Sequence, residues 1–286
     1  MTSVVAACVQ MNAGPDVTAN LGQAARLIRE ARREGASLIC TPENTGRILA
    51  DRVRAVAEAP AERDHPALPF FADLARETGA WLLIGSIAVR VSPERCGNRS
   101  LLFDPGGRLV ARYDKIHMFD VELANGEHYR ESERMQPGGA AVLAETPWGG
   151  LGMTICYDLR FPLLYRALAQ AGADYLAIPS AFTRPTGVAH WETLLRARAI
   201  ECGAYVLAPA QCGIHDGGRG TWGHSMIVSP WGEVIAAAAE EPGTILATLD
   251  REKVREARRM IPALGHDRPF EGPETAGSKA AKTAAA

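Results

Sequence analysis

The 286-residue chain lacks any apolar run close to the roughly 20 residues that a membrane-spanning helix requires. Its first residues, MTSVVAACVQMNAG, lack the basic stretch and the small-residue cleavage site of a secretory signal. It also has no block of Lys or Arg long enough to neutralise a row of phosphates, and its formal net charge is -2. We therefore expect a cytoplasmic protein that binds neither membrane nor nucleic acid.

The cysteines form no C-x-x-C pair, and their spacing gives no zinc site, so we expect free thiols and no metal. The glycine-rich segment DGGRG at 216–220 is not followed by the Lys and Ser or Thr of a phosphate-binding loop. This segment is better explained as a mobile turn. The six cysteines stand at positions 8, 40, 96, 156, 202 and 212.

No linker or internal repeat divides the chain, so we expect a single domain over residues 1–270. Residues 271–286, EGPETAGSKAAKTAAA, contain no large apolar side chain and are predicted to be disordered because they offer no surface to bury. Early in the chain a strand at 3–10 precedes a helix at 20–35, where apolar residues recur at helical spacing. A second strand, SLICTPEN, occupies 37–44.

The second half continues the alternation of strands and helices. A strand is predicted at 149–158, a helix at 160–172 and a second helix at 187–203. Between the halves, DPGGR supplies the backbone angles of a hairpin turn. Alternating elements combined with hairpins predict an α/β protein with mixed sheets covered by helices.

Three residues that carry chemistry lie at predicted strand ends or in the loops that follow: Glu43 in CTPEN, Lys115 in RYDKIH and Cys156 in TICYDLRFP. Each alone has a simple structural explanation: Glu43 as a helix cap, Lys115 as a residue of a solvated turn and Cys156 as a packing residue. Together they supply a thiol nucleophile, an ammonium that stabilises anions, and a carboxylate that accepts a proton. This set suffices for amide hydrolysis.

The segments TPEN, YDKIHMFD and RESERMQPG, and above all the stretch from TPWGGLGMTICYDLRFP to VLAPAQCG, resemble the nitrilase-related carbon-nitrogen hydrolases. The resemblance extends from about residue 3 to about 270 and is strongest to the Nit branch, the deaminated glutathione amidases. It implies a four-layer α-β-β-α sandwich of two mixed sheets with outer helices. It also implies a homodimer or higher homo-oligomer joined through helices, and no cofactor.

The resemblance assigns roles to individual positions. Glu43 matches the general base, Lys115 the catalytic lysine and Cys156 the nucleophile. Glu131 matches a second glutamate that supports Lys115 or positions the substrate, although a solvated loop charge would also explain it. The chemistry of an acyl transfer further suggests that Lys115 and the backbone N–H of Tyr157 hold the oxyanion.

Three further residues resemble pocket residues of the Nit branch that contact an α-keto acid: Arg160, Phe182 and Thr186. The planar guanidinium of Arg160 is suited to clamp a carboxylate. The alternatives are an ion pair between Arg160 and Asp158, and a core position for Phe182.

The expected activity is hydrolysis of the primary amide of deaminated glutathione, or of a similar small α-keto acid amide, through a cysteine thioester with release of ammonia. The alternatives are an omega-amidase acting on α-ketoglutaramate or succinamate, and an N-carbamoyl amide hydrolase. A non-catalytic binding protein is disfavoured because Glu43, Lys115 and Cys156 are all present. A serine hydrolase is excluded because GHSMI lacks the second glycine of a nucleophile elbow and leads into a strand.

Overall fold

Two six-stranded sheets form the centre of the computed structural model, which describes residues 2–124 and 126–272. The strand order is β16-β1-β2-β3-β4-β5 in the first sheet and β15-β14-β11-β10-β9-β8 in the second. The strands of the first sheet are β1 (Ser3–Gln10), β2 (Leu38–Cys40), β3 (Trp81–Arg90), β4 (Cys96–Phe103), β5 (Leu109–Asp114) and β16 (Gly243–Asp250). Those of the second are β8 (Val142–Thr146), β9 (Gly149–Met153), β10 (Ala173–Ala177), β11 (Tyr205–Ala208), β14 (Met226–Val228) and β15 (Val234–Ala237).

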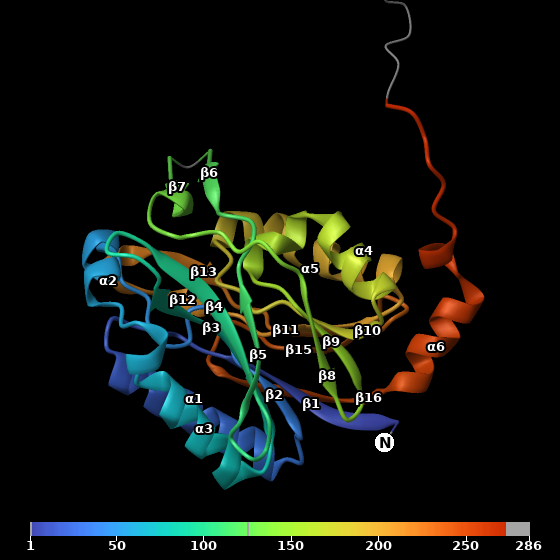
Figure 1. Cartoon of the computed structure of the whole chain (residues 1–286), viewed down its shortest axis with the longest axis horizontal. Coiled ribbons are helices and arrows are strands. Elements are labelled where there is room, and N and C mark those ends of the chain that lie inside the picture. The colour runs from blue at the N-terminus through green and yellow to red at the C-terminus, as the bar shows by residue number, and fades with distance from the viewer. Residues whose placement is uncertain (1, 125, 273–286) are drawn as a thin grey trace, which may run out of the picture.

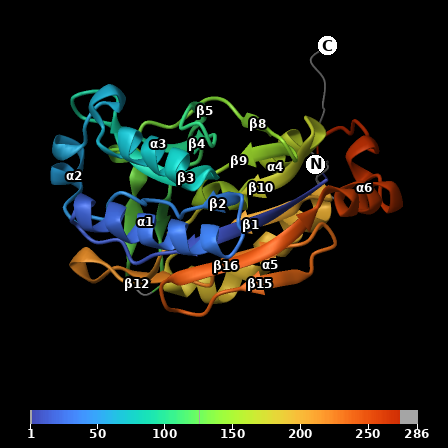
Figure 2. The ribbon, with the colours of Figure 1, turned by 90° about the horizontal axis from the view of Figure 1, so that it is seen from below.

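Helices cover the outer face of each sheet, so the four-layer α-β-β-α sandwich predicted from the resemblance is confirmed (Figure 1). The helices α1 and α3 lie against the first sheet, and α4 and α5 lie against the second (Figures 1 and 2). The helices are α1 (Val17–Arg33), α2 (Arg52–Glu58), α3 (Ala67–Thr78), α4 (Pro162–Gln170), α5 (Arg184–Cys202) and α6 (Arg251–Met260).

The period-two alternation of β1 shows how the layers are built. Val4, Ala6 and Cys8 point into the core between the two sheets, whereas Ala7 and Val9 point toward α1 and α3. All five side chains are buried, as expected for a central strand covered on both faces. The hydrophobic cores therefore occupy the space between the sheets and the space beneath each helical layer.

Each sheet has three parallel central strands flanked by antiparallel neighbours. β1, β2 and β3 run parallel in the first sheet, and β9, β10 and β11 run parallel in the second. Isolated bridges and hydrogen bonds join the two sheets just beyond these strands, for example from the side-chain amide of Gln211 to the carbonyl of Glu43 at 3.0 Å. The carboxyl ends of both sets of parallel strands therefore meet at one place.

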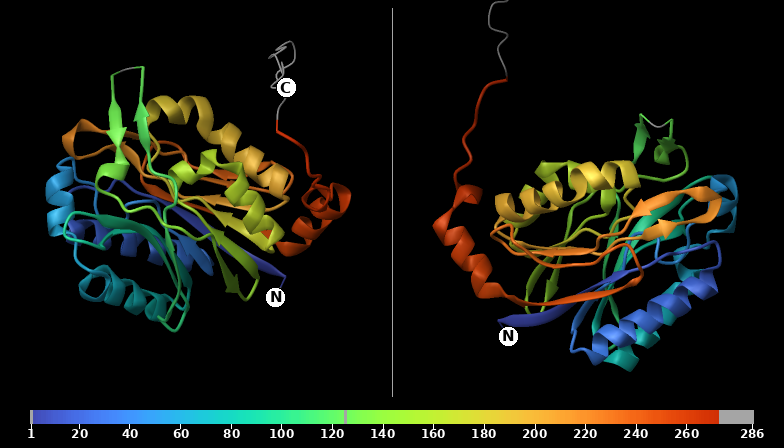
Figure 3. Two further views of the ribbon diagram at one scale, coloured as in Figure 1. Left: turned by 45° about the horizontal axis from the view of Figure 1, so that its top comes forward. Right: turned by 180° about the vertical axis from the view of Figure 1, so that it is seen from behind.

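Two small hairpins complete the fold: β6 (Asp120–Glu122) with β7 (His128–Arg130), and β12 (Cys212–Ile214) with β13 (Gly220–Trp222). The β6–β7 hairpin projects above the sandwich, and α6 lies at the opposite end of the molecule (Figure 3). None of the helices within the described ranges is long and apolar enough to cross a membrane.

The predicted strand at 149–158 is wrong over its second half. β9 ends at Met153, and residues Cys156–Arg160 form a short 3-10 helix. The apolar run continues through Ile155, but the buried backbone there leaves the sheet so that Asp158 can accept a hydrogen bond from the N–H of Ile155 at 2.9 Å. The change of direction places Cys156 in a turn instead of a strand.

The sequence did not predict α2 or α6. In α2 only Val56 is buried, and in α6 only Val254 and Ala257 are, so neither helix has the broad apolar stripe that periodicity detects. Of the predicted disordered tail at 271–286, residues 273–286 lie outside the described residues.

Candidate active site

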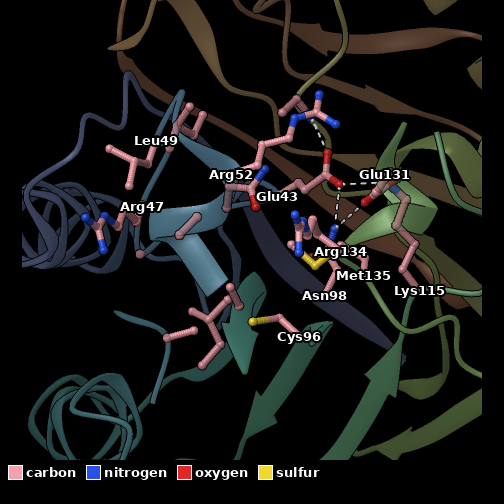
Figure 4. Close-up of a pocket in the computed structure, with 18 of the residues that line it drawn as sticks. Glu43, Arg47, Leu49, Arg52, Cys96, Asn98, Lys115, Glu131, Arg134 and Met135 are labelled. Carbon is pink, nitrogen blue, oxygen red and sulfur yellow. Dashed lines mark hydrogen bonds and ion pairs between the residues drawn. The ribbon is translucent and has the colours of Figure 1, made fainter. Parts of the chain in front are cut away.

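One cavity of about 390 Å³ is lined by Glu43, Lys115, Glu131, Cys156 and Tyr157. Figure 4 shows Glu43, Lys115 and Glu131 in contact with one another. Glu43 follows β2, Lys115 follows β5, and Cys156 follows β9. The structure thus brings together residues that are far apart in the sequence, because the ends of these strands converge.

The loop that carries Glu43 is fixed by close packing against β3. Gly85 on β3 lies so near this loop that a Cβ atom there would stand 2.1 Å from the carbonyl oxygen of Thr41, so only glycine fits. The N–H of Gly85 donates to the Thr41 hydroxyl at 3.0 Å, and the N–H of Asn44 donates to Ser86 at 2.9 Å. These contacts hold the Glu43 carboxylate in place.

Lys115 lies between two carboxylates. Its Nζ donates to Glu43 Oε1 at 3.0 Å and to the two oxygens of Glu131 at 3.1 and 2.9 Å. Glu131 is fixed in turn by the N–H of Phe119, which donates to its Oε2 at 2.7 Å. Lys115 is 2% exposed and Glu43 3%, so the ion pair is removed from water. The alternative reading of Glu131 as a solvated loop charge is therefore wrong.

Asn98 on β4 is a member of this cluster that the sequence did not reveal. Its side-chain amide donates to Glu43 at 2.9 Å and to Glu131 at 3.3 Å. The side-chain oxygen Oδ1 of Asn98 is buried and has no hydrogen-bond partner among the described residues. Asn98 lines the cavity. The only hint in the sequence is a polar residue inside an otherwise strand-forming segment.

The second carboxylate oxygen of Glu43, Oε2, is bound by a backbone N–H that follows strand β10 of the opposite sheet. It accepts a hydrogen bond from the N–H of Ala181 at 2.9 Å, and the carboxylate also interacts with the thiol of Cys156. Cys156 has a φ of 49°, a backbone conformation that costs energy for any residue other than glycine. Its own N–H donates to Pro179 at 2.9 Å, which holds the strained turn.

The electrostatics of the site keep Glu43 and Lys115 charged. Burial alone would raise the pKa of Glu43, but the Lys115 ammonium and hydrogen bonds to the carboxylate outweigh burial, so this pKa is lowered. Burial likewise opposes the charge of Lys115, but Glu131 and Glu43 raise its pKa well above the usual value. Burial and the Glu43 carboxylate raise the pKa of Cys156. At neutral pH the site therefore holds a neutral thiol beside a charged carboxylate.

The directions of these two pKa shifts define the pH range over which the ion pair stabilises the fold. Because the pKa of Glu43 is lowered, its contribution is present above the unfolded value of about 4.3 and is lost as the pH falls through the folded pKa. Because the pKa of Lys115 is raised, its contribution is present below about 10.4 and is lost as the pH rises through the folded pKa. The pair therefore contributes fully across neutral pH.

Tyr157 follows the nucleophile, and its ring packs edge-on against Phe119 and Phe161. Its backbone N–H donates to no acceptor in the part of the chain that the structure describes. A free N–H directly after a nucleophile is the arrangement that an oxyanion requires.

Asp158 ties the nucleophile turn to the segment that carries Lys115. Its carboxylate accepts from the N–H of Ile155 at 2.9 Å and from the hydroxyl of Tyr113 at 2.6 Å. It also bonds the backbone N–H of His117 at 3.0 Å and its ring Nδ1 at 2.7 Å. Asp158 is fully buried, so these bonds fix the position of Cys156 relative to Lys115.

We predict that Asp158→Asn lowers kcat by about tenfold to a hundredfold, because an amide offers only one acceptor oxygen and the two catalytic segments lose their common anchor. The unfolding free energy should also fall by about 1–3 kcal/mol. Measurement of kcat and of thermal unfolding checks both effects. Asp267→Asn is the matched control because Asp267 is exposed and pairs with Arg166 on the surface. Wild-type kcat in Asp158→Asn would contradict the assignment.

The structure also locates the three residues that were predicted to contact the substrate. Phe182 and Thr186 line the cavity. Phe182 also belongs to the hydrophobic core, where its ring packs against Trp191, so the core alternative for Phe182 is confirmed and its contact with substrate stays a prediction. The Arg160 guanidinium lies over the rings of Tyr157 and Phe182, at 5.9 and 5.3 Å, and bonds His190 at 3.3 Å. The alternative ion pair with Asp158 is absent among the described residues. A carboxylate-clamping role for Arg160 stays a prediction.

Other predicted features can be located as well. All six cysteines are free and buried. No group of three His, Cys, Asp or Glu side chains in residues 2–124 and 126–272 is arranged to hold a metal ion. The glycine-rich segment 216–220, interpreted as a turn, includes Arg219, which lines the cavity and whose charge contributes to lowering the pKa of Glu43.

Comparison with known proteins agrees with this geometry. The family model described as carbon-nitrogen hydrolase matches residues 5–259. The chain is 41% identical to a deaminated glutathione amidase of Yersinia enterocolitica, over 94% of each protein. It is 42% identical to a deaminated glutathione amidase of Homo sapiens, over 93% of this chain and 82% of the human protein. The crystal structure of the C. elegans NitFhit protein superposes with a TM-score of 0.87 at 36% identity, covering 94% of this chain and 66% of that one.

A family model that spans nearly the whole chain, together with the matching fold, places the protein among enzymes that cleave carbon-nitrogen bonds. The chain belongs to the carbon-nitrogen hydrolase family, and its relatives from Yersinia enterocolitica and Homo sapiens are named as amidases.

Proposed function

We propose that this protein hydrolyses the amide of deaminated glutathione through a thioester on Cys156. The observation that carries the proposal is the buried cluster in which Lys115 lies 3.0 Å from Glu43, while the same carboxylate contacts the Cys156 thiol. The names of the relatives from Yersinia enterocolitica and Homo sapiens support the choice of substrate.

The bond to be cleaved follows from the chemistry of this substrate. Glutathione carries no primary amide: its γ-glutamyl group is joined to cysteinylglycine through a secondary amide. Deamination converts the glutamyl amine to a keto group, so hydrolysis releases α-ketoglutarate and cysteinylglycine. The expectation of a primary amide and of ammonia release is therefore wrong for deaminated glutathione and applies to α-ketoglutaramate, whose amide is primary.

The reaction begins with proton transfer from the thiol of Cys156 to Glu43. Because the pKa of Cys156 is raised in the free protein, the transfer accompanies attack of sulfur on the amide carbonyl carbon. Negative charge then develops on the carbonyl oxygen, where Lys115 Nζ and the N–H of Tyr157 can stabilise it. Collapse breaks the carbon-nitrogen bond, and Glu43 returns its proton to the leaving amine.

The second half of the reaction regenerates the enzyme. Glu43, again ionised, takes a proton from water, and the hydroxide oxygen attacks the thioester carbon. The carbon-sulfur bond breaks, the acid leaves, and Cys156 recovers its proton. Throughout, Glu131 and Asn98 hold Lys115 and Glu43 in their relative positions.

The shape of the cavity supports a substrate longer than α-ketoglutaramate. Beyond the catalytic residues it extends along Arg47, Leu49 and Arg52 toward α2 (Figure 4). An omega-amidase substrate such as α-ketoglutaramate or succinamate carries no group beyond the cleaved bond to occupy this space.

We predict that kcat/KM for deaminated glutathione exceeds that for α-ketoglutaramate by at least about tenfold, because the cysteinylglycine arm adds contacts in the extended cavity. Initial rates for both compounds, with cysteinylglycine and ammonia quantified separately, measure this ratio. Succinamate and an N-carbamoyl amine serve as comparison substrates. A higher kcat/KM for α-ketoglutaramate would overturn the substrate assignment and leave the mechanism in place.

We further propose a single catalytic domain over residues 1–270, a cytoplasmic location and a homodimer or larger homo-oligomer. The exposed apolar side chains Val188 and Ile200 on α5 support assembly through that helix. Analytical ultracentrifugation of the full chain tests the oligomer: a monomer at micromolar concentration would contradict it.

A further inference from the structure

Four arginine side chains line the cavity: Arg47, Arg52, Arg134 and Arg219. Arg47 is neutralised by Glu58, whose carboxylate lies 2.7 Å from its guanidinium. Within the described part of the chain the other three form no ion pair with a carboxylate. A cavity wall that carries guanidinium groups without carboxylate partners is suited to an anionic ligand.

Two of these arginines meet at one ring. The guanidinium carbon of Arg52 lies 5.7 Å from the centre of the Tyr129 ring, and that of Arg219 lies 5.4 Å from it. Tyr129 on β7 is held by its hydroxyl, which donates to Glu127 at 2.7 Å. α2 and the β12–β13 turn therefore bring two positive charges to the same part of the cavity wall.

Arg219 is positioned close to the catalytic carboxylate. Its Nη2 donates to the carbonyl of Ala181 at 2.8 Å. The N–H of Ala181 in turn donates to Glu43. The Nε of Arg219 is buried and has no hydrogen-bond partner among the described residues. One edge of this guanidinium is thus fixed by the protein, and a donor remains for a ligand.

Arg52 belongs to α2, which contributes no group to the cluster of Glu43, Lys115 and Cys156, so it is available to a part of the substrate other than the cleaved bond. In deaminated glutathione the group beyond that bond is cysteinylglycine, whose two residues span up to about 7 Å when extended and end in a carboxylate. α-Ketoglutaramate has no such arm.

We propose that Arg52 and Arg219 bind the terminal carboxylate of the cysteinylglycine arm, an inference that rests on the proposed function. The two guanidiniums would hold the carboxylate beside Tyr129 and thereby distinguish deaminated glutathione from shorter α-keto acid amides. Arg52 is then a specificity-determining residue.

The experiment replaces Arg52 by Gln, which keeps a good helix former at this position but removes the charge. The ratio of kcat/KM for deaminated glutathione to kcat/KM for α-ketoglutaramate should fall at least about tenfold, because a charge-assisted pair to the carboxylate is lost. Arg54→Gln is the matched control: Arg54 lies on the same helix, is exposed, and pairs with Glu58 at 2.6 Å. An unchanged ratio in Arg52→Gln, or an equal fall in Arg54→Gln, overturns the inference.

A binding measurement separates this inference from the proposed function. Calorimetry with Cys156→Ala and with Cys156→Ala/Arg52→Gln measures the affinity for deaminated glutathione without turnover. If the wild-type protein does not hydrolyse this compound, the proposed function fails. The carboxylate site still stands if the Kd rises at least tenfold in the double variant, and it falls if both variants bind equally or neither binds.

Discussion

Cys156→Ala should reduce amide hydrolysis to background while the protein stays folded. The substitution removes the sulfur proposed to form the covalent intermediate, and among the described residues Cys156 is the thiol that is hydrogen-bonded to Glu43. Alanine is smaller than cysteine and fits the same buried turn, so the midpoint of thermal unfolding should change by no more than about 5 °C. Steady-state kinetics and circular dichroism measure the two properties.

A second buried cysteine provides the control for this prediction. Cys202 lies at the end of α5, is fully buried and does not line the catalytic cavity, so Cys202→Ala should retain wild-type kcat. Cys156→Ser tests the chemistry more finely, because a hydroxyl is far less acidic than a thiol and should be almost inactive in the same position. Substantial turnover by Cys156→Ala would refute the thioester mechanism.

Lys115→Met should lower kcat/KM about a hundredfold to a thousandfold, because methionine keeps much of the side-chain length but removes the ammonium that stabilises the oxyanion. The same change leaves Glu43 and Glu131 close together without a cation. Burial and like charge should then raise the pKa of Glu43, whose lowering in the wild type depends on Lys115. The acid limb of the pH-rate profile should therefore move to higher pH.

The kinetics of Lys115→Met should be recorded from about pH 4 to 8 together with its circular dichroism, since loss of a buried ion pair also destabilises the fold by about 3–5 kcal/mol. Lys253→Met is the control, because Lys253 lies exposed on α6. A folded Lys115→Met protein with activity within a few fold of wild type, or with an unshifted acid limb, would show that the ammonium has no catalytic role.

The sequence predicted the cluster of Glu43, Lys115 and Cys156 better than it predicted the residues around that cluster. Glu43, Lys115 and Cys156 were identified because each stands in a recognisable segment at or near a strand end, and strand ends converge in α/β folds. Asn98 was missed because its contact with Glu43 joins residues 55 positions apart on different elements. Only the register of β4 determines that its side chain reaches the cavity.

Asp158 illustrates a different limit. In sequence it stands two residues from Arg160, and a local ion pair was the alternative to a carboxylate clamp by Arg160. The fold instead buries the carboxylate among donors from Tyr113, Ile155 and His117. Two of these donors come from another segment of the chain, so local spacing gave no information about them.

The residues of the cavity wall away from the predicted cluster could not be predicted from the sequence either. α2 has seven residues, of which one side chain is buried. Arg52 on this helix stands out as a possible ligand-binding residue only once the fold places it near Tyr129 and Arg219. The proposed specificity residues therefore lie on loops and short elements, whereas the proposed catalytic residues follow strands of the two sheets.

The proposed mechanism depends most directly on acylation of Cys156. Wild-type protein that is turning over deaminated glutathione or α-ketoglutaramate can be quenched in acid, digested and analysed by mass spectrometry. We predict that both compounds leave the same α-ketoglutaryl group on the peptide containing Cys156, and leave Cys96, the other thiol in the cavity wall, unmodified. Turnover without any adduct on Cys156, or with the acyl group on a different residue, would contradict the mechanism.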